Sequence, residues 1–169
     1  GDLMCLAYAN TYKLPVVITR SSNNFGPYQH VEKFIPLFTT NAMEGRDLPL
    51  YGDGMHQRDW IFVEDNCRAI ALVAEKGNDG EIYNIAVGNS QPNLRVAELI
   101  LKHVGGSKSR IVFIEDRKGH DRMYCLAADK VRKLLRRIQR ERDITMIYTS
   151  HNMRDVQEVC DRVLFMHKG

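Results

Sequence analysis

The sequence predicts an α/β fold with parallel strands, and two observations support this prediction. Runs rich in β-branched residues, at 16–19 and 81–87, alternate with segments whose apolar residues recur at helical spacing. Strands that alternate with helices are typical of parallel sheets, and the 81–87 run is apolar enough to be covered on both faces. With 169 residues, of which 44% are hydrophobic, the chain is long enough to bury a core.

Each element follows from a local pattern. Helical spacing predicts helices over 2–12, 34–43, the stretch after Asp65, the stretch after Asn93, and 130–142. Further strands are predicted on either side of a glycine turn within 48–65, and at 111–114, 144–149 and 163–166. Asp65 and Asn93 are expected to cap the helices that follow them, and Gly45 is expected to end the second helix.

Two further expectations concern the first thirty residues. In the first helix Leu3, Leu6 and Ala7 recur at helical spacing. The segment 20–29 is polar and contains Gly26-Pro27, which argues against a regular element there.

The composition indicates a cytoplasmic protein. No run approaches the roughly 18 consecutive apolar residues that a membrane span needs, and the chain does not begin with a signal-peptide pattern. Cys5, Cys67, Cys125 and Cys160 are far apart and form no Cys-x-x-Cys pair, so no metal site and no redox pair are expected. We expect these cysteines to be reduced thiols in the core.

The stretch 48–65 organises the chemistry of the chain. Gly52 and Gly54 allow a tight turn, and Arg58 follows with a fixed fork of donors that suits a phosphate or diphosphate. The alternative is a hairpin with a solvated charge. Trp60 is expected to be a core residue beside the site rather than a platform for a base.

Two other polar segments could join this stretch in one pocket. Asn23 and Asn24 follow a predicted strand, where parallel sheets hold ligands, and their amides can accept from hydroxyls and donate to phosphate. Arg117 lies in a loop with several charged residues and a glycine, and could bind phosphate or ribose. The alternatives, an Asn-rich turn and a charged loop, stay open on the residues alone.

With these three segments included, residues 1 to about 128 resemble the C-terminal, substrate-binding part of dTDP-glucose 4,6-dehydratases. These are extended short-chain dehydrogenase/reductases of the NAD-dependent epimerase/dehydratase family. The resemblance implies an incomplete Rossmann-type fold, NAD as cofactor, a nucleotide-sugar substrate and a homodimer. The family's Tyr-x-x-x-Lys motif and glycine-rich fingerprint do not occur in the 169 residues, so we expect the chain alone to be inactive.

The resemblance also assigns site residues. Substrate contacts are implied for Asn23, Lys33, Phe34, Pro49, Leu50, Tyr51, Arg58, Asn93, Asp116, Arg117, Gly119 and His120. Ser22 and Asn24 are implied to lie beside the nicotinamide. At Asn93 a substrate contact competes with the helix-cap reading, and both could hold. Lys118 stands where the family has proline, which makes that loop less stiff.

The last part of the chain, 129–169, differs from a dehydratase. It holds ten Lys or Arg against six Asp or Glu, a shift that can mark a domain boundary. Thr149-Ser150-His151-Asn152-Met153 resembles the switch-histidine region of ATP-binding cassette ATPases, which implies that His151 contacts a γ-phosphate. The chain would then be a composite, with a dehydratase part at 1–128 and an α/β fragment of an ATPase at 129–169.

Two alternatives to the dehydratase function remain open. One is a fragment of a transporter ATPase, and the other is a non-catalytic interaction module in which the helix at 130–142 contacts an acidic partner. Valine, leucine and isoleucine at 131, 134, 135 and 138 give this helix an inward stripe. Its basic face is then an ordinary solvated surface, and we expect no nucleic-acid partner.

Overall fold

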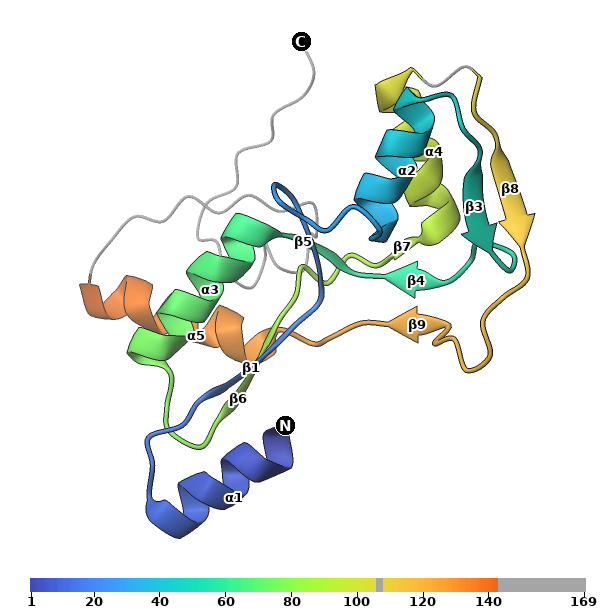
Figure 1. Cartoon of the computed structure of the whole chain (residues 1–169). Coiled ribbons are helices and arrows are strands. Elements are labelled where there is room, and N and C mark those ends of the chain that lie inside the picture. Colours follow the sequence, from blue (N-terminus) through green and yellow to red (C-terminus); the bar gives the residue numbers. More distant parts are fainter. Residues whose placement is uncertain (106–107, 143–169) are drawn as a thin grey trace. The chain divides into compact units, whose positions relative to one another are not determined.

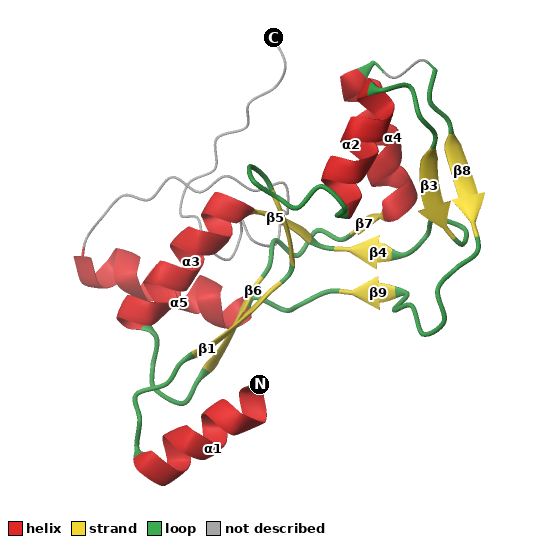
Figure 2. Cartoon of the chain, in the orientation of Figure 1, coloured by secondary structure: helices red, strands yellow, loops and turns green. Residues whose placement is uncertain are grey.

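The computed structural model of the chain describes residues 1–105 and 108–142. Within these residues the chain forms two compact units (Figures 1 and 2). The first unit contains residues 1–21 and 65–89 and the described residues from 126 onward. The second unit contains 22–64 and the described residues of 90–125.

The first unit is built on a parallel strand pair. Strands β1 (Ile18–Ser21) and β6 (Ile82–Ile85) pair with Ile18 opposite Ile82 and Ser21 opposite Ile85. The unit also contains helix α1 (Asp2–Tyr12), most of α3 (Val63–Lys76) and α5 (Asp129–Arg142). Figure 1 shows β1 and β6 side by side.

The helix α5 supplies much of the first unit's apolar core. Val131, Leu134 and Ile138 are buried, as the helical stripe predicts, and α5 packs on β6. Some of its basic residues are already paired inside this unit. Lys130 forms an ion pair with Glu81, and the Nη2 of Arg137 donates to the carbonyl of Lys76 at 2.6 Å.

The second unit contains three groups of strands. Strands β3 (Leu48–Tyr51) and β8 (Ile111–Ile114) pair in parallel, as do β2 (Asn23–Phe25) and β5 (Trp60–Phe62). A third sheet has β4 (Gln57–Arg58) at its centre, between β7 (Gln91–Pro92) and β9 (Met123–Tyr124).

Two helices cover the β3–β8 pair. Helices α2 (Phe34–Met43) and α4 (Asn93–Val104) pack against each other and against β3. Their buried core comprises Phe38, Ala42, Leu48, Leu50 and Ala97. Phe38 and Ala42 lie one turn apart on α2, so the same face of the helix carries both.

The glycine turn between β3 and β4 is held against α4. Gly54 has φ +73°, and a Cβ placed there would lie 2.5 Å from the Cδ2 of Leu50 and 3.1 Å from the Cβ of Leu94. Its carbonyl accepts from the backbone N–H of Leu94 at 2.9 Å. Glycine is therefore required at this position both for its backbone angle and for space.

Several expectations about elements need correction. The first predicted strand is displaced by two residues, to 18–21. Asn23–Phe25, expected to be irregular, is strand β2, because β5 supplies a partner that lies far along the sequence. Strand β6 buries Tyr83 and Ile85 on one face, whereas Ile82 and Asn84 on the other face are only partly buried, so the second face is less covered than predicted. Helix α1 forms, but among the described residues it buries no side chain, and Leu3 is 85% exposed.

Both predicted side-chain caps are wrong. Helix α3 begins at Val63, so Asp65 lies inside its first turn and pairs with Arg68 at 3.3 Å. Helix α4 begins at Asn93 itself, with Pro92 in the cap position and no side-chain cap. A cap must precede the first helical residue, and neither side chain does. By contrast, α2 ends at Met43, as predicted, and Gly45 follows its cap residue Glu44 with φ +70°.

The cysteines are not core residues. Cys5, Cys67 and Cys125 are free thiols, as predicted, but all three are exposed, while Cys160 lies outside the described residues. The Oγ of Ser90 and the Sγ of Cys125 form a hydrogen bond. None of the helices in the described ranges is both long and apolar enough to span a bilayer.

Candidate functional site: a polar cavity in the second unit

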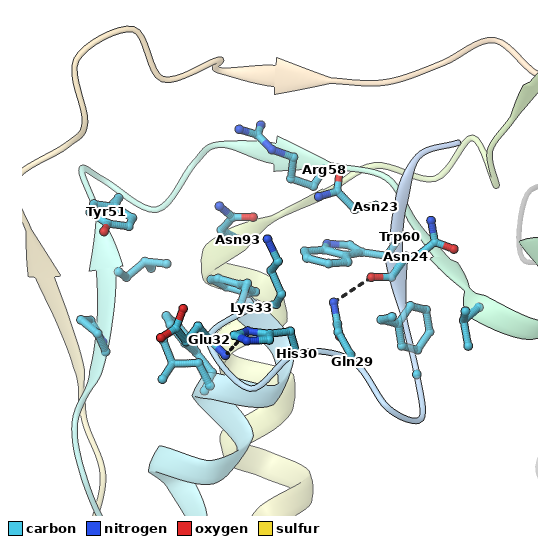
Figure 3. Close-up of a pocket in the computed structure, with 18 of the residues that line it drawn as sticks. Asn23, Asn24, Gln29, His30, Glu32, Lys33, Tyr51, Arg58, Trp60 and Asn93 are labelled. Carbon is cyan, nitrogen blue, oxygen red and sulfur yellow. Dashed lines mark hydrogen bonds between the residues drawn. The ribbon is translucent and has the colours of Figure 1, made fainter. Parts of the chain in front are cut away.

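A cavity of about 890 Å³ lies within the second unit. Its wall is formed by the loop after β2, the start of α2, the end of β3, strands β4 and β5, the start of α4 and the loop after β8. Figure 3 shows the polar side chains of this wall, with Lys33 extending into the space that they enclose. A volume of this size is within the range of small-molecule sites.

The three segments singled out in the sequence meet at this cavity. Asn23, Arg58 and Arg117 all line it, although they come from β2, β4 and the loop after β8. The backbone explains part of this convergence. Asn23 pairs with Trp60 across β2 and β5, and Arg58 lies two residues before Trp60.

Two helix N-termini meet the same cavity. Lys33 and Phe34 begin α2 and Asn93 begins α4, and all three line the wall. Neither helix has an acidic residue in its first turn. The positive end of the dipole at each helix start therefore favours an anion in the cavity, although the N–H groups of Asn93 and Leu94 already donate to the carbonyls of His56 and Gly54.

The side chains of the wall also carry mostly positive charge, like the helix starts. Lys33, Arg58 and Arg117 are cationic, and Glu32 is the one carboxylate among the lining residues. Arg58 donates through Nη1 to the carbonyl of Gln57 at 2.7 Å and through Nη2 to that of Asp121 at 2.8 Å. These two bonds fix its plane and use only two of its five N–H groups.

Four buried polar atoms of the wall have no hydrogen-bond partner among the described residues. They are Asn24 Oδ1, Gln29 Oε1, Trp60 Nε1 and Asn93 Oδ1. Buried polar atoms are nearly always satisfied, so such atoms gathered around one cavity indicate that a ligand or water completes them. Three of them accept and the indole N–H donates, so the complementary molecule offers both kinds of group.

Trp60 belongs to the site itself. Its ring stacks on Phe34 at 5.9 Å between ring centres, with 26° between the planes. It was expected to be a core residue beside the site, yet it is only half-buried and lines the cavity. The stacking holds the indole N–H at the wall, which a sequence pattern does not reveal.

Arg117 is held from two sides. Its guanidinium carbon lies 4.8 Å from the ring centre of Tyr51, and its Nη2 lies 3.0 Å from the Nε2 of His120. Its backbone N–H donates to the Oδ1 of Asp116 at 2.8 Å. Arg117 thus covers one face of the ring of Tyr51, which is itself a predicted substrate contact.

A pair of histidines stands behind this loop. The rings of His56 and His120 stack at 4.0 Å between centres. Asp116 accepts a hydrogen bond from His120, and the Nε2 of His56 lies 3.0 Å from its other oxygen. Burial, followed by the neighbouring His120, lowers the pKa of His56 below its usual 6.5. The hydrogen bond from His120 is the main cause of a lowered pKa at Asp116. His56 was not identified from the sequence, because its partners lie sixty or more residues away.

The predicted substrate residues divide into two groups. Those that line the cavity are Asn23, Lys33, Phe34, Pro49, Leu50, Tyr51, Arg58, Asn93, Arg117 and His120. Asp116 and Gly119 do not line it, and Asp116 instead supports its neighbours. Of the two predicted cofactor neighbours, Asn24 lines the cavity and Ser22 does not. The role of each toward a ligand stays a prediction.

The prediction for the last part of the chain lies mostly outside the described residues. His151 and the strands expected at 144–149 and 163–166 fall there, so the likeness to an ATPase stays untested. The boundary near 128 also stays a prediction. Helix α5, which begins at Asp129, belongs to the first unit.

Comparison with known proteins identifies the family. The family model described as the NAD dependent epimerase/dehydratase family matches residues 1–86. The chain belongs to this family. NAD is therefore the family's cofactor, in agreement with the prediction, and the α/β class is confirmed.

Individual relatives extend the likeness through the second unit. The chain is 50% identical over 134 residues to the low-salt glycan biosynthesis protein Agl12 of Haloferax volcanii, covering 79% of this chain and 43% of the relative. It is 49% identical over 131 residues to a dTDP-glucose 4,6-dehydratase of an Actinoplanes species, covering 78% and 41%. The chain thus spans about two fifths of the length of these relatives.

Solved structures agree. The dTDP-glucose 4,6-dehydratase of Bacillus anthracis, solved in complex with NAD, superimposes with a TM-score of 0.74 at 48% identity. The match covers 88% of this chain and 45% of that one. Ser22 and Asn24, which are expected beside the nicotinamide, fit such a role chemically, because Ser22 Oγ and Asn24 Oδ1 are buried without a partner among the described residues.

Proposed function

We propose that this chain forms the nucleotide-sugar-binding part of a 4,6-dehydratase that acts on dTDP-glucose. The observation that carries this proposal is the convergence of two acid-free helix starts and three cationic side chains on one cavity. This arrangement suits a diphosphate, which needs several donors and positive charge at short range. We take the identity of the nucleotide and the sugar from the relatives, which are named dTDP-glucose 4,6-dehydratases.

Each part of the ligand has a matching part of the wall. Lys33, Arg58 and Arg117 are assigned to the diphosphate, because they carry the positive charge. The unpartnered carbonyl oxygens of Asn24 and Asn93 are assigned to hydroxyl or imide donors of the cofactor, sugar or base. Pro49, Leu50 and Tyr51 offer the apolar surface for the base.

The test is calorimetric titration of dTDP-glucose into the purified chain. Arg117→Ala is expected to weaken binding by about 10- to 100-fold, the usual effect of losing a charge-assisted hydrogen bond. Arg95→Ala is the matched control, because Arg95 lies on α4, pairs with Glu98 and does not line the cavity. Equal loss in both variants, or no binding by the unaltered chain, would refute the proposal.

We further infer that these 169 residues bind without turning the substrate over. The Tyr-x-x-x-Lys motif, to which the family resemblance assigns the base, is not among them. Formation of a 4-keto sugar nucleotide from dTDP-glucose and NAD by the purified chain would contradict this inference. Sedimentation of the same sample tests the homodimer that the resemblance implies.

A further inference from the structure

The strongest feature that the proposed function does not use is the buried histidine His56. It is 2% exposed and lies in the turn between β3 and β4. Its Nε2 lies 3.0 Å from the Oδ2 of Asp116, and the Nδ1 of His120 lies 2.7 Å from the Oδ1 of the same carboxylate. Two imidazoles thus share one carboxylate, each through a different oxygen.

The direction of these hydrogen bonds follows from Arg117. A guanidinium can only donate, so the Nε2 of His120, 3.0 Å from Arg117 Nη2, must accept. The proton of neutral His120 then lies on Nδ1 and is donated to Asp116. A carboxylate oxygen at 3.0 Å repels a nitrogen lone pair, so the Nε2 of His56 carries its proton. The lone pair is then on Nδ1, which has no partner among the described residues.

The same trio offers three ligand atoms within 4.8 Å of one another, but the protons argue against a metal ion. Both nitrogens that face the carboxylate already hold hydrogen. In addition, the rings stack with only 18° between their planes, so one ion cannot lie in the plane of both. Metals bind the unprotonated nitrogen near the ring plane.

Asp116 is the centre of this arrangement. Besides the hydrogen bond from His120 and the close approach of His56, it accepts the backbone N–H of Arg117 at 2.8 Å. Gly52 leaves it the necessary space, since a Cβ there would lie 3.2 Å from Asp116 Oδ2. The carboxylate therefore fixes both the main chain of Arg117 and, through His120, its guanidinium.

We propose that His56 is a positioning residue for the diphosphate site: its buried Nε2–H orients Asp116, which holds His120 and Arg117 at the cavity wall. This role rests on the proposed function, in which Arg117 binds the diphosphate of the ligand. His56 also holds a second part of the wall, since its carbonyl accepts the backbone N–H of Asn93 at 2.9 Å. One buried residue thus orders two sides of the cavity.

The test compares two substitutions at His56. His56→Phe keeps the ring that stacks on His120 but removes the donor, whereas His56→Gln keeps an N–H donor without the ring. We expect His56→Phe to weaken dTDP-glucose binding by about tenfold and to leave binding of thymidine, which lacks the diphosphate, unchanged. His56→Gln is expected to stay within about threefold of the unaltered chain.

A second measurement needs no ligand. Long-range ¹⁵N–¹H NMR of the side chains reports which nitrogen of His120 is protonated. We expect Nδ1–H in the unaltered chain and in His56→Gln, and a mixture of tautomers in His56→Phe. If His56→Phe does not fold, Asp116→Asn is measured in its place. The amide NH2 of the new asparagine would face one of the two imidazole N–H groups, donor against donor. The tautomer of His120 should then be disturbed as much as in His56→Phe.

The outcomes separate the two proposals. If the unaltered chain does not bind dTDP-glucose, the proposed function fails, and the NMR result alone decides whether His56 orders His120. If the unaltered chain binds and His56→Phe binds equally well with an unchanged His120 tautomer, the positioning role is overturned while the proposed function stands. Equal loss of binding in His56→Phe and His56→Gln would also overturn it, since the donor would then not matter.

Discussion

Arg122 donates to both carboxylate oxygens of Asp53, with 2.6 Å between Nη1 and Oδ1 and 2.7 Å between Nη2 and Oδ2. This pair joins the glycine turn after β3 to the segment that leads into β9. It lies within the second unit, and Asp53 belongs to the same turn between β3 and β4 as His56. A two-point arginine–carboxylate contact is the strongest form of surface ion pair.

Replacing this carboxylate should have a small effect that depends on pH. Arg122 holds the pKa of Asp53 well below its usual 3.8, so the charged form stabilises the fold above about pH 4, and this contribution is lost as the pH falls below that value. Because both side chains are exposed, we expect Asp53→Asn to lower the melting temperature at pH 7 by less than about 4 °C.

Melting curves of Asp53→Asn at pH 7 and pH 3 check this expectation. The difference from the unaltered chain should shrink at pH 3. Asp65→Asn is the control, because its contact with Arg68 is a single longer one within α3. A difference that grows toward acid pH would contradict the assignment of the Asp53 pKa.

Gly54 and Gly105 offer a matched test of steric crowding. Both have positive φ, +73° and +71°, but of the two only a Cβ at Gly54 would meet other atoms among the described residues, at 2.5 Å from Leu50. Gly105→Ala is expected to cost about 1 kcal/mol for the backbone angle alone. Gly54→Ala should cost roughly 1 to 3 kcal/mol more, because Leu50 and Leu94 must move. Urea unfolding measures both, and equal losses would disprove the close contact.

Substitution of Asn93 separates the cap from the ligand contact. A side-chain cap is worth about 1 kcal/mol, but α4 has none, so we expect Asn93→Ala to change the unfolding free energy by less than about 0.5 kcal/mol. The same change removes a buried acceptor from the cavity and should weaken dTDP-glucose binding by about tenfold. Urea unfolding and calorimetry distinguish the two, and a large stability loss with unchanged affinity would restore the cap reading.

Trp60 provides an optical signal for the cavity. It is the single tryptophan of the chain and lines the cavity with its indole N–H unpartnered. We expect its fluorescence to change in proportion to bound dTDP-glucose. Trp60→Phe should keep the contact with Phe34 and weaken binding by about three- to tenfold, because the N–H donor is lost. Saturable binding by calorimetry without any change in emission would place the ligand elsewhere.

Local patterns predicted what depends on neighbouring residues. The stripe of Val131, Leu134 and Ile138 recurs at helical spacing, and α5 buries these three side chains. The strand at 111–114 was placed correctly for the same reason. The three polar segments could be placed at one cavity because the resemblance covers all of them.

The errors concern relations between distant residues. Asn23–Phe25 forms a strand only because Trp60–Phe62 pairs with it. Asn93 lost its cap role because the helix begins one residue earlier than the cap pattern requires. His56 could not be identified, since its function depends on a carboxylate sixty positions later.

The cavity wall is drawn from stretches of the second unit that lie far apart in sequence. A molecule bound there contacts all of these stretches only while the unit is folded. Its binding therefore raises the free energy of unfolding of the second unit. Each tenfold excess of free ligand over its dissociation constant adds about 1.4 kcal/mol. A panel of sugar nucleotides can therefore be ranked by thermal shift, and the preferred sugar can be identified without observing any reaction.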